Sequence, residues 1–138
     1  MIGIVIVAHG GLAREYLAVM EHVVGKHPGT AAVSIGPDDD RSAKQAEIDA
    51  AVAAVDEGAG VVVVTDMFGG TPSNLAMRAC RQEKRVVLYG ANIPLLIKLA
   101  KARRLSLDEA VSCALTAGRK YINTADGYGP RNGVPVSF

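Results

Sequence analysis

Tryptophan is absent from the 138-residue sequence, and aromatic residues make up only 4% of it. A surface that stacks nucleic-acid bases or sugar rings therefore has little to be built from. Charges of the two signs nearly cancel, because 15 Lys+Arg stand against 14 Asp+Glu and leave a formal net charge of +1. This balance provides no electrostatic attraction toward nucleic acid or an anionic membrane surface, and we expect the protein to bind neither.

Long apolar runs are also lacking. Runs such as Ile4–Ala8 and Val61–Val64 are far shorter than the roughly 20 residues that a membrane-spanning helix needs. The chain is strand-like from Ile2 onward and shows no basic leader, so we expect no secretory signal. Cys80 and Cys113 have no CxxC spacing, which indicates small core side chains rather than a disulfide or a zinc site. These features predict a cytoplasmic protein without direct membrane insertion.

Strand and helix patterns alternate along the chain, whose length fits one domain with a sizeable core. The alternation predicts an α/β three-layer sandwich, with a mostly parallel four-stranded sheet in the order 2-1-3-4 and helices on both faces. We expect residues 1–124 to form the domain and residues 125–138, which are rich in glycine and proline, to form a C-terminal tail. The predicted strands cover residues 2–8, 31–35, 61–65 and 85–89, and the predicted helices cover residues 12 to about 25, 41–57, 72–82, 93–103 and 107–120.

Three loops follow the carboxyl ends of the predicted strands, where open α/β sheets bind ligands: residues 9–11, 66–71 and 90–92. If the first and third strands are neighbours, His9 and Asp66 meet across the crevice at similar heights. A carboxylate that accepts a hydrogen bond from one ring nitrogen of His9 fixes the tautomer and leaves the other nitrogen as a nucleophile. A loop histidine with only a local hydrogen bond is the alternative for His9 taken alone.

The second of these loops adds features suited to an anion. Gly69 and Gly70 have no Cβ atoms to block a close approach, and Thr71 and Pro72 are favoured as the N-cap and the first residue of a helix. Backbone N–H groups and the helix dipole at such an N-terminus bind phosphoryl groups. The combination predicts a phosphohistidine site on His9, although a simple strand-to-helix turn would also use these residue types.

Motifs for other ligands are missing. The sequence contains neither the GxxxxGK[ST] string of a nucleotide site nor the GxGxxG string of a dinucleotide fold. The acidic run Asp38–Asp40 precedes a predicted helix, where acidic residues are ordinary capping and dipole partners, so we expect no metal site. A module that binds an anion in the same crevice without covalent chemistry is an interpretation from a different functional class.

Three stretches resemble a known family: IVIVAHG at residues 4–10, TDMFGGTPSN at residues 65–74 and GANIPLL at residues 90–96. A weaker likeness lies in TAGR at residues 116–119. In order and spacing they resemble the IIA component of the mannose/fructose-type bacterial phosphoenolpyruvate-dependent sugar phosphotransferase system. The resemblance covers about residues 1–120, and the DxFGGTPxN string that carries it is highly specific.

The resemblance implies a phosphocarrier, in which His9 accepts a phosphoryl group from the histidine phosphocarrier protein and passes it to a separate IIB component for sugar uptake. It also implies that Asp66 holds the histidine by a hydrogen bond and that Thr71 lies near the phosphate, and it implies no metal or organic cofactor. A regulatory phosphocarrier, whose phosphorylation state is sensed by a partner without sugar transport, has the same sequence features and remains open at this point.

Partner docking and subunit exchange are further expectations. Transfer between two proteins needs a shallow, exposed site with some apolar surface, and Met67 and Phe68 beside the site are candidates for it. Phe68 could equally cap the core. The resemblance implies a homodimer that exchanges a C-terminal strand, which would lie near residues 120–123 or 134–138 or be absent.

Overall fold

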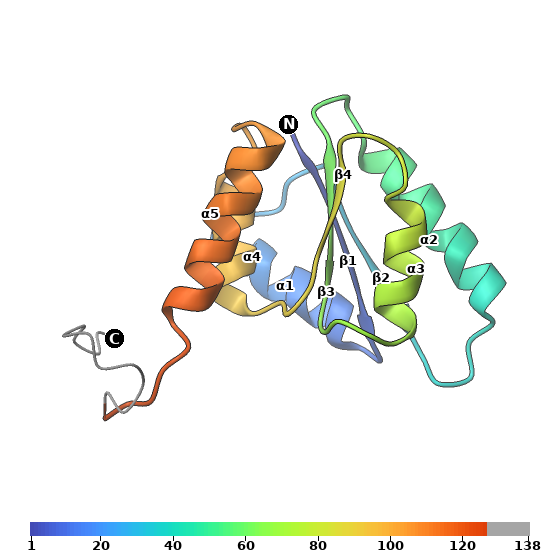
Figure 1. The fold of residues 1–138 in the computed structure, drawn as a ribbon, viewed down its shortest axis with the longest axis horizontal. Helices are drawn as coiled ribbons and strands as arrows, with labels where there is room; N and C mark the ends of the chain where they lie inside the picture. Colours follow the sequence, from blue (N-terminus) through green and yellow to red (C-terminus); the bar gives the residue numbers. More distant parts are fainter. Residues whose placement is uncertain (127–138) are drawn as a thin grey trace.

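Four parallel strands form the centre of the molecule in the computed structural model, which describes residues 1–126 (Figure 1). They are β1 (Gly3–His9), β2 (Thr30–Ile35), β3 (Val61–Thr65) and β4 (Arg85–Leu88). Their order in the sheet is β2-β1-β3-β4, and each neighbouring pair is parallel, as predicted. All four carboxyl ends therefore lie at one edge of the sheet, which is the lower edge in Figure 1.

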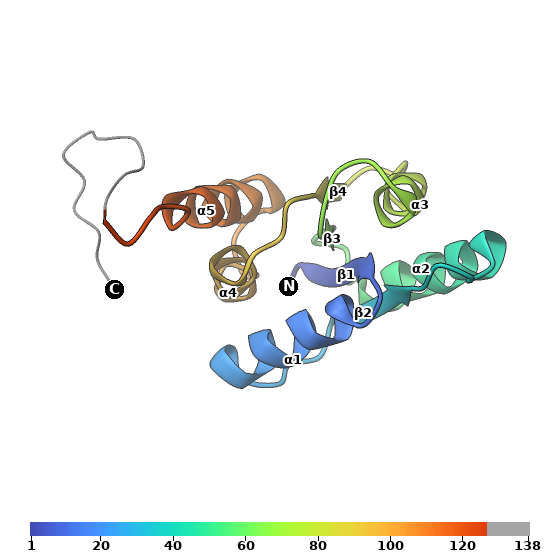
Figure 2. The same cartoon turned by 90° about the horizontal axis from the view of Figure 1, so that it is seen from below.

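Helices cover both faces of the sheet and confirm the predicted three layers (Figure 2). One face is covered by α1 (Leu12–Val24), α4 (Ile93–Lys101) and α5 (Leu107–Lys120), and the other face by α2 (Arg41–Val55) and α3 (Thr71–Ala79). The C-terminal ends of α2, α3 and α4 come earlier than predicted. Helix α3, for example, ends at Ala79, and the Cys80 N–H donates to the Met77 carbonyl, three residues back, in a tighter final turn.

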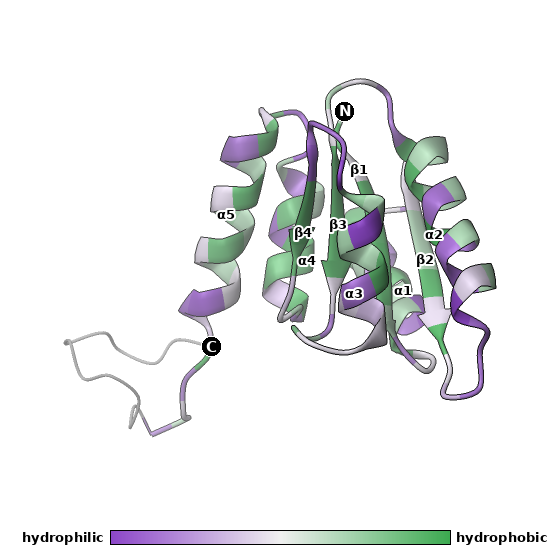
Figure 3. Cartoon of the chain, turned by 45° about the vertical axis from the view of Figure 1, so that its right-hand side comes forward, coloured by the Kyte–Doolittle hydropathy of each residue, from purple (hydrophilic) through white to green (hydrophobic). Residues whose placement is uncertain are grey.

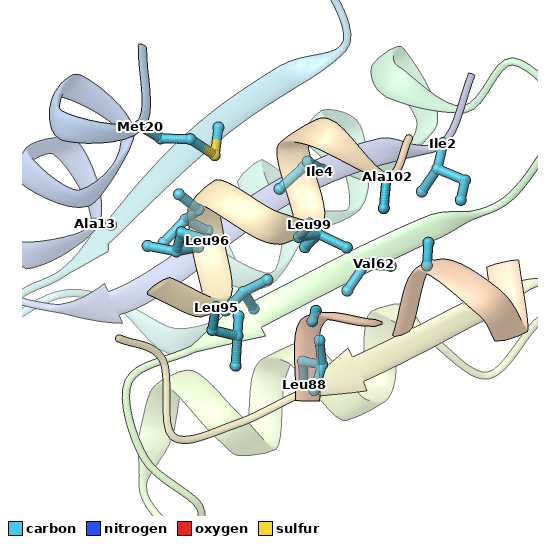
Figure 4. Packing of buried hydrophobic residues seen from close by; sticks show 14 of the residues in the cluster. Ile2, Ile4, Ala13, Met20, Val62, Leu88, Leu95, Leu96, Leu99 and Ala102 are labelled. Atoms are coloured by element: carbon cyan, nitrogen blue, oxygen red, sulfur yellow. The ribbon is translucent and has the colours of Figure 1, made fainter. Parts of the chain in front are cut away.

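The strands are apolar on both faces because each face meets its own layer of helices. Successive side chains of a strand point to opposite faces, so Ile4 and Ile6 join the cluster beneath α1, α4 and α5, while Val5 and Val7 join the cluster beneath α2 and α3. All four are fully buried. Figure 3 shows the apolar strands between helices with mixed surfaces, and Figure 4 shows part of the first cluster, including Leu96 of α4.

Side-chain caps fix the starts of three helices. Asp40 accepts a hydrogen bond from Ala43 N–H at 2.9 Å in front of α2, which is the capping role expected of the acidic run. Ser106 likewise accepts from the N–H of the third residue of α5 at 3.3 Å. Asn92 has two contacts, because its Oδ1 accepts from Leu95 N–H at 3.0 Å and its amide donates to the Gly118 carbonyl at 2.8 Å. Asn92 therefore caps α4 and ties it to α5.

The C-terminal predictions are only partly covered by the structure. Residues 121–126 form no strand in the described part of the chain, and α5 ends at Lys120, so the first proposed position of the exchanged strand is irregular here. The second, residues 134–138, and most of the tail predicted for 125–138 lie outside the described residues. The domain boundary and the strand exchange stay predictions. Within residues 1–126, no helix combines the length and the apolar character needed to cross a membrane.

Replacing Asn92 tests the tie between α4 and α5. We expect Asn92→Ala to lower the free energy of unfolding by about 1–2 kcal/mol, because it removes a helix cap and leaves a half-buried carbonyl of α5 without its donor. Denaturant unfolding measures the change. Asn74→Ala, on the exposed side of α3, is the matched control. Equal effects of the two substitutions would contradict a structural role for Asn92.

Candidate functional site

His9 and Asp66 meet at the carboxyl edge of the sheet, as the predicted strand order requires. His9 ends β1 and Asp66 follows β3, and these strands are paired with Val7 beside Thr65. The distance from His9 Nδ1 to Asp66 Oδ2 is 2.8 Å, and the His9 backbone N–H donates to the same oxygen at 3.1 Å. The other oxygen, Oδ1, accepts from Met67 N–H at 3.0 Å. Asp66 is thus held by three donors.

This contact decides which nitrogen of His9 can react. An ionised carboxylate only accepts hydrogen bonds, so the hydrogen between Nδ1 and Oδ2 belongs to the histidine. In the neutral ring the proton on Nδ1 leaves Nε2 with a free lone pair. The His9 side chain is 50% exposed, whereas that of Asp66 is 12% exposed. The nucleophilic nitrogen is therefore accessible, and the group that orients it is covered.

The charge on Asp66 is maintained by its neighbours. Burial by itself raises the pKa of this carboxyl, but the hydrogen bonds from the His9 ring and backbone, the nearby His9 charge and the backbone N–H of Asp66 itself outweigh burial. The net effect holds the pKa of Asp66 below its ordinary value. Burial, and secondly the Asp66 charge, raise the pKa of Tyr16, whose hydroxyl donates to the Ala91 carbonyl at 3.1 Å. Tyr16 thus supports the loop after β4 as a neutral donor.

Glycines provide open space beside the histidine ring. A Cβ atom placed on Gly70 would lie 3.6 Å from His9 Cε1 and 3.7 Å from Nε2, so any side chain there would occupy the approach to the reactive nitrogen. A Cβ atom placed on Gly69 would have no other atom within 4 Å. The φ angles of Gly69 and Gly70 are 79° and 135°, in the range that L residues with side chains rarely adopt. Both glycines are therefore favoured by their conformation, and Gly70 in addition leaves the approach to the ring open.

The start of α3 differs from the prediction by one residue. The N-cap is Gly70 rather than Thr71, and no side chain caps this helix. The reason is the positive φ of Gly70, which completes the turn earlier and leaves Thr71 as the first residue inside the helix. The uncapped N-terminus of α3 thus begins at Gly70, whose Cβ position lies 3.6 Å from Cε1 of the His9 ring.

A hollow of about 330 Å³ opens beside His9. Its wall includes the loop after β2 and the first turn of α2, together with two of the predicted site residues, His9 and Thr71. The lining residues are His9, Gly10, Ile35, Gly36, Pro37, Asp39, Arg41, Lys44 and Thr71. A larger hollow of about 610 Å³ between α4 and α5 contains none of the predicted site residues.

Two cations in the wall of the 330 Å³ hollow beside His9, Arg41 and Lys44, were not predicted from the sequence. The signal was present, because β2 neighbours β1 in the predicted order and the loop after β2 must reach the same edge of the sheet. Lys44 donates to Glu47 at 3.0 Å and lies 3.8 Å from Asp39.

Exposed apolar side chains form a rim beside the site. Met67 is 53% exposed and Phe68 is 61% exposed, so Phe68 is not a cap of the core. Tyr89, which the prediction placed at the end of a strand, follows β4 and is 56% exposed. Its ring centroid lies 5.0 Å from that of Phe68, within the range of favourable aromatic pairs. We refer to Met67, Phe68 and Tyr89 as the apolar rim.

Comparison with known proteins identifies the family. Residues 3–114 match the sequence family described as the phosphotransferase system (PTS) fructose IIA component. The chain belongs to the PTS fructose/mannose IIA family. This finding confirms the resemblance seen in the three sequence stretches.

Individual relatives agree with this assignment to the IIA family. The PTS system mannose-specific EIIAB component of Escherichia coli (strain K12) is 32% identical over 122 residues, which are 86% of this chain and 38% of that protein. The chain thus spans 38% of the length of this relative. The PTS system sorbose-specific EIIA component of Lacticaseibacillus casei is 27% identical over 79% of this chain and 80% of that protein. The solved mannose/sorbose specific IIA subunit from Enterococcus faecalis has a TM-score of 0.74 at 30% identity, covering 88% of this chain and 92% of that one.

The depressed pKa of Asp66 predicts an acid-dependent loss of stability. Asp66→Asn lowers the free energy of unfolding at pH 7 by about 1–2 kcal/mol, because an amide N–H₂ replaces one of two accepting oxygens. The folded carboxyl releases its proton at a lower pH than the unfolded one, so its contribution is complete above the unfolded pKa of about 4 and is lost as pH falls below it.

Urea unfolding of both proteins from pH 7 down to pH 3 measures this difference. The difference in the free energy of unfolding between the wild-type protein and Asp66→Asn should become smaller below about pH 4. Asp38→Asn is the control, since among residues 1–126 the exposed Asp38 side chain makes no hydrogen bond or ion pair. A difference in the free energy of unfolding that stays constant with pH would show that the charge of Asp66 does not stabilise the fold.

Proposed function

We propose that this protein carries a phosphoryl group on Nε2 of His9, taking it from the histidine phosphocarrier protein and passing it to a separate IIB component for sugar uptake. The observation that carries the proposal is the 2.8 Å contact between His9 Nδ1 and Asp66 Oδ2, which leaves Nε2 unprotonated and exposed. Membership of the IIA family and the mannose- and sorbose-specific names of its relatives support a role in a sugar relay.

The proposed transfer is a displacement at phosphorus. The Nε2 lone pair of His9 forms the new N–P bond as the N–P bond of the donor histidine breaks, and that bond's electron pair returns to the donor ring. Positive charge develops on the His9 ring during the attack, and the Asp66 carboxylate at Nδ1 stabilises it. In the second transfer, a nucleophile of the IIB component forms the new bond to phosphorus as the N–P bond of His9 breaks, and that bond's electron pair returns to the His9 ring.

The phosphoryl group on Nε2 would lie against Gly69, Gly70 and Thr71. The missing Cβ atom of Gly70 leaves room for phosphoryl oxygens close to the ring. The uncapped N-terminus of α3 offers backbone N–H donors and the positive end of its helix dipole. We therefore assign these three residues to phosphate binding.

The apolar rim is the proposed docking surface for both partners. Transient interfaces of a relay are small, and a few apolar anchors provide much of their affinity. Met67, Phe68 and Tyr89 are exposed, and the Phe68 and Tyr89 rings form a tilted pair, so they offer such anchors without loss of core packing.

Removing the His9 ring tests the carrier directly. We expect His9→Ala to take up no phosphoryl group from phosphoenolpyruvate, enzyme I and the histidine phosphocarrier protein, because the attacking nitrogen is lost. Intact-protein mass spectrometry measures the uptake. His22→Ala and His27→Ala, which remove the other two histidines of the chain, should be labelled like the wild-type protein. Labelling of His9→Ala would overturn the proposal.

Shortening Phe68 separates docking from chemistry. We expect Phe68→Ala to raise the KM for the phosphorylated histidine phosphocarrier protein about 5-fold or more, with kcat changed much less, because an exposed anchor is lost while the His9–Asp66 pair remains. Leu105→Ala is the control, since Leu105 is 44% exposed in the segment that joins α4 to α5, and this segment lies at the end of the sheet opposite the carboxyl ends of the strands (Figure 1). An unchanged KM would place the docking surface elsewhere.

A further inference from the structure

We propose that Arg41 binds the phosphoryl group while it is on His9, so that the first turn of α2 completes the phosphoryl site. The inference rests on the proposed function, because it needs a phosphoryl group on His9. Arg41 lies on α2, outside the family motif stretches and outside the loops after β1, β3 and β4. The basis of the inference is the shared hollow, the charges in its wall and the way α2 is fixed.

The strand order places Arg41 and His9 on the same hollow. His9 is aligned with Ile35, the last residue of β2, and the chain then passes through a short loop to Arg41, the first residue of α2. The side chain of Asp40 caps this helix through Ala43 N–H at 2.9 Å, which fixes where Arg41 stands. His9, Thr71 and Arg41 all line the same 330 Å³ space.

The charges in the wall leave Arg41 available for an anion. Lys44 is already paired with Glu47 at 3.0 Å and lies 3.8 Å from Asp39. Asp39 is the one carboxylate in the lining, and it also accepts a hydrogen bond from Gly36 N–H at 2.6 Å. Within residues 1–126, Arg41 makes no hydrogen bond or ion pair. It is therefore the cation of this wall without a carboxylate partner.

A phosphorylated His9 changes the charge of this hollow. Arg41 and Lys44 against Asp39 give its wall a net charge of +1, whereas a phosphoryl group adds about −1.5 to −2 near neutral pH. A guanidinium group matches the oxygens of a phosphoryl group with two parallel N–H donors, and an ammonium group does not. Arg41 thus supplies the phosphorylated site with both a positive charge and two parallel N–H donors. A lysine at position 41 would supply only the charge.

The test uses potassium phosphoramidate as the phosphoryl donor, because this small molecule needs no docking surface. His9 Nε2 forms the N–P bond, the donor's P–N bond breaks, and its nitrogen leaves as ammonia after taking a proton from water. The proteins are the wild type, Arg41→Gln, Arg41→Lys and Arg78→Gln. The last is the matched control, because Arg78 on α3 shares a neighbouring hollow with Arg41 but does not line the hollow of His9.

Two quantities are measured by ³¹P NMR: the rate of phosphorylation and the pH at the midpoint of the second ionisation of the phosphoryl group. For Arg41→Gln we expect a rate about 10-fold lower and a midpoint about one pH unit higher, because the dianion has lost its cation. For Arg41→Lys we expect a rate and a midpoint between those of Arg41→Gln and the wild type. Arg78→Gln should match the wild type in both.

The outcomes distinguish the two proposals. If the wild type is phosphorylated and Arg41→Gln equals it in rate and midpoint, Arg41 has no phosphoryl contact and only this inference fails. Equal changes in Arg41→Gln and Arg78→Gln would also overturn it, because they would reflect the general field of the surface. If the wild type takes up no phosphoryl group either from phosphoramidate or from phosphoenolpyruvate, enzyme I and the histidine phosphocarrier protein, the proposed function fails and this inference fails with it.

Discussion

The carboxylate of Asp66 joins the ends of two neighbouring parallel strands, and the geometry of the site depends on this contact. The bond from the His9 backbone fixes the carboxylate relative to β1, and the bond to the ring fixes the imidazole relative to the carboxylate. Because Met67 N–H holds the second oxygen, the carboxylate cannot rotate away. The orientation of Nε2 thus follows from the pairing of β1 with β3 rather than from a flexible loop.

This arrangement combines a rigid support with an open reactive group. The strands beneath the site are fully buried on both faces, whereas the ring of His9 is half exposed and faces glycine positions. A carrier that exchanges a group with two other proteins needs both properties, because the nitrogen must be fixed in direction and also reachable by a bulky partner. The apolar rim and the cationic wall at Arg41 flank this open position from different strands.

The central features of the fold and site were predictable because local signals sufficed for them. Continuous β-branched runs predicted the strands, their alternation with helices predicted the parallel sheet, and the strand order then brought His9 and Asp66 together. The prediction that Thr71 is the N-cap of α3 was wrong by one residue, because Gly70 takes a φ of 135° and occupies the N-cap position itself. The predicted strand order already placed the start of α2 at the same edge of the sheet, but which of its side chains line the hollow depends on packing, so Arg41 was missed. Tyr89 was missed because its contact with Phe68 joins two different loops.

The role of Asp66 is tested most directly by which nitrogen of His9 carries the phosphoryl group. Long-range ¹H–¹⁵N NMR of the ¹⁵N-labelled protein, before and after phosphorylation, resolves this. We predict that Nδ1 carries the proton in the free protein and that the ¹⁵N–³¹P coupling appears at Nε2 of His9 in the phosphorylated protein. A phosphoryl group on Nδ1, or on a residue other than His9, would contradict the role of Asp66 on which the account is built.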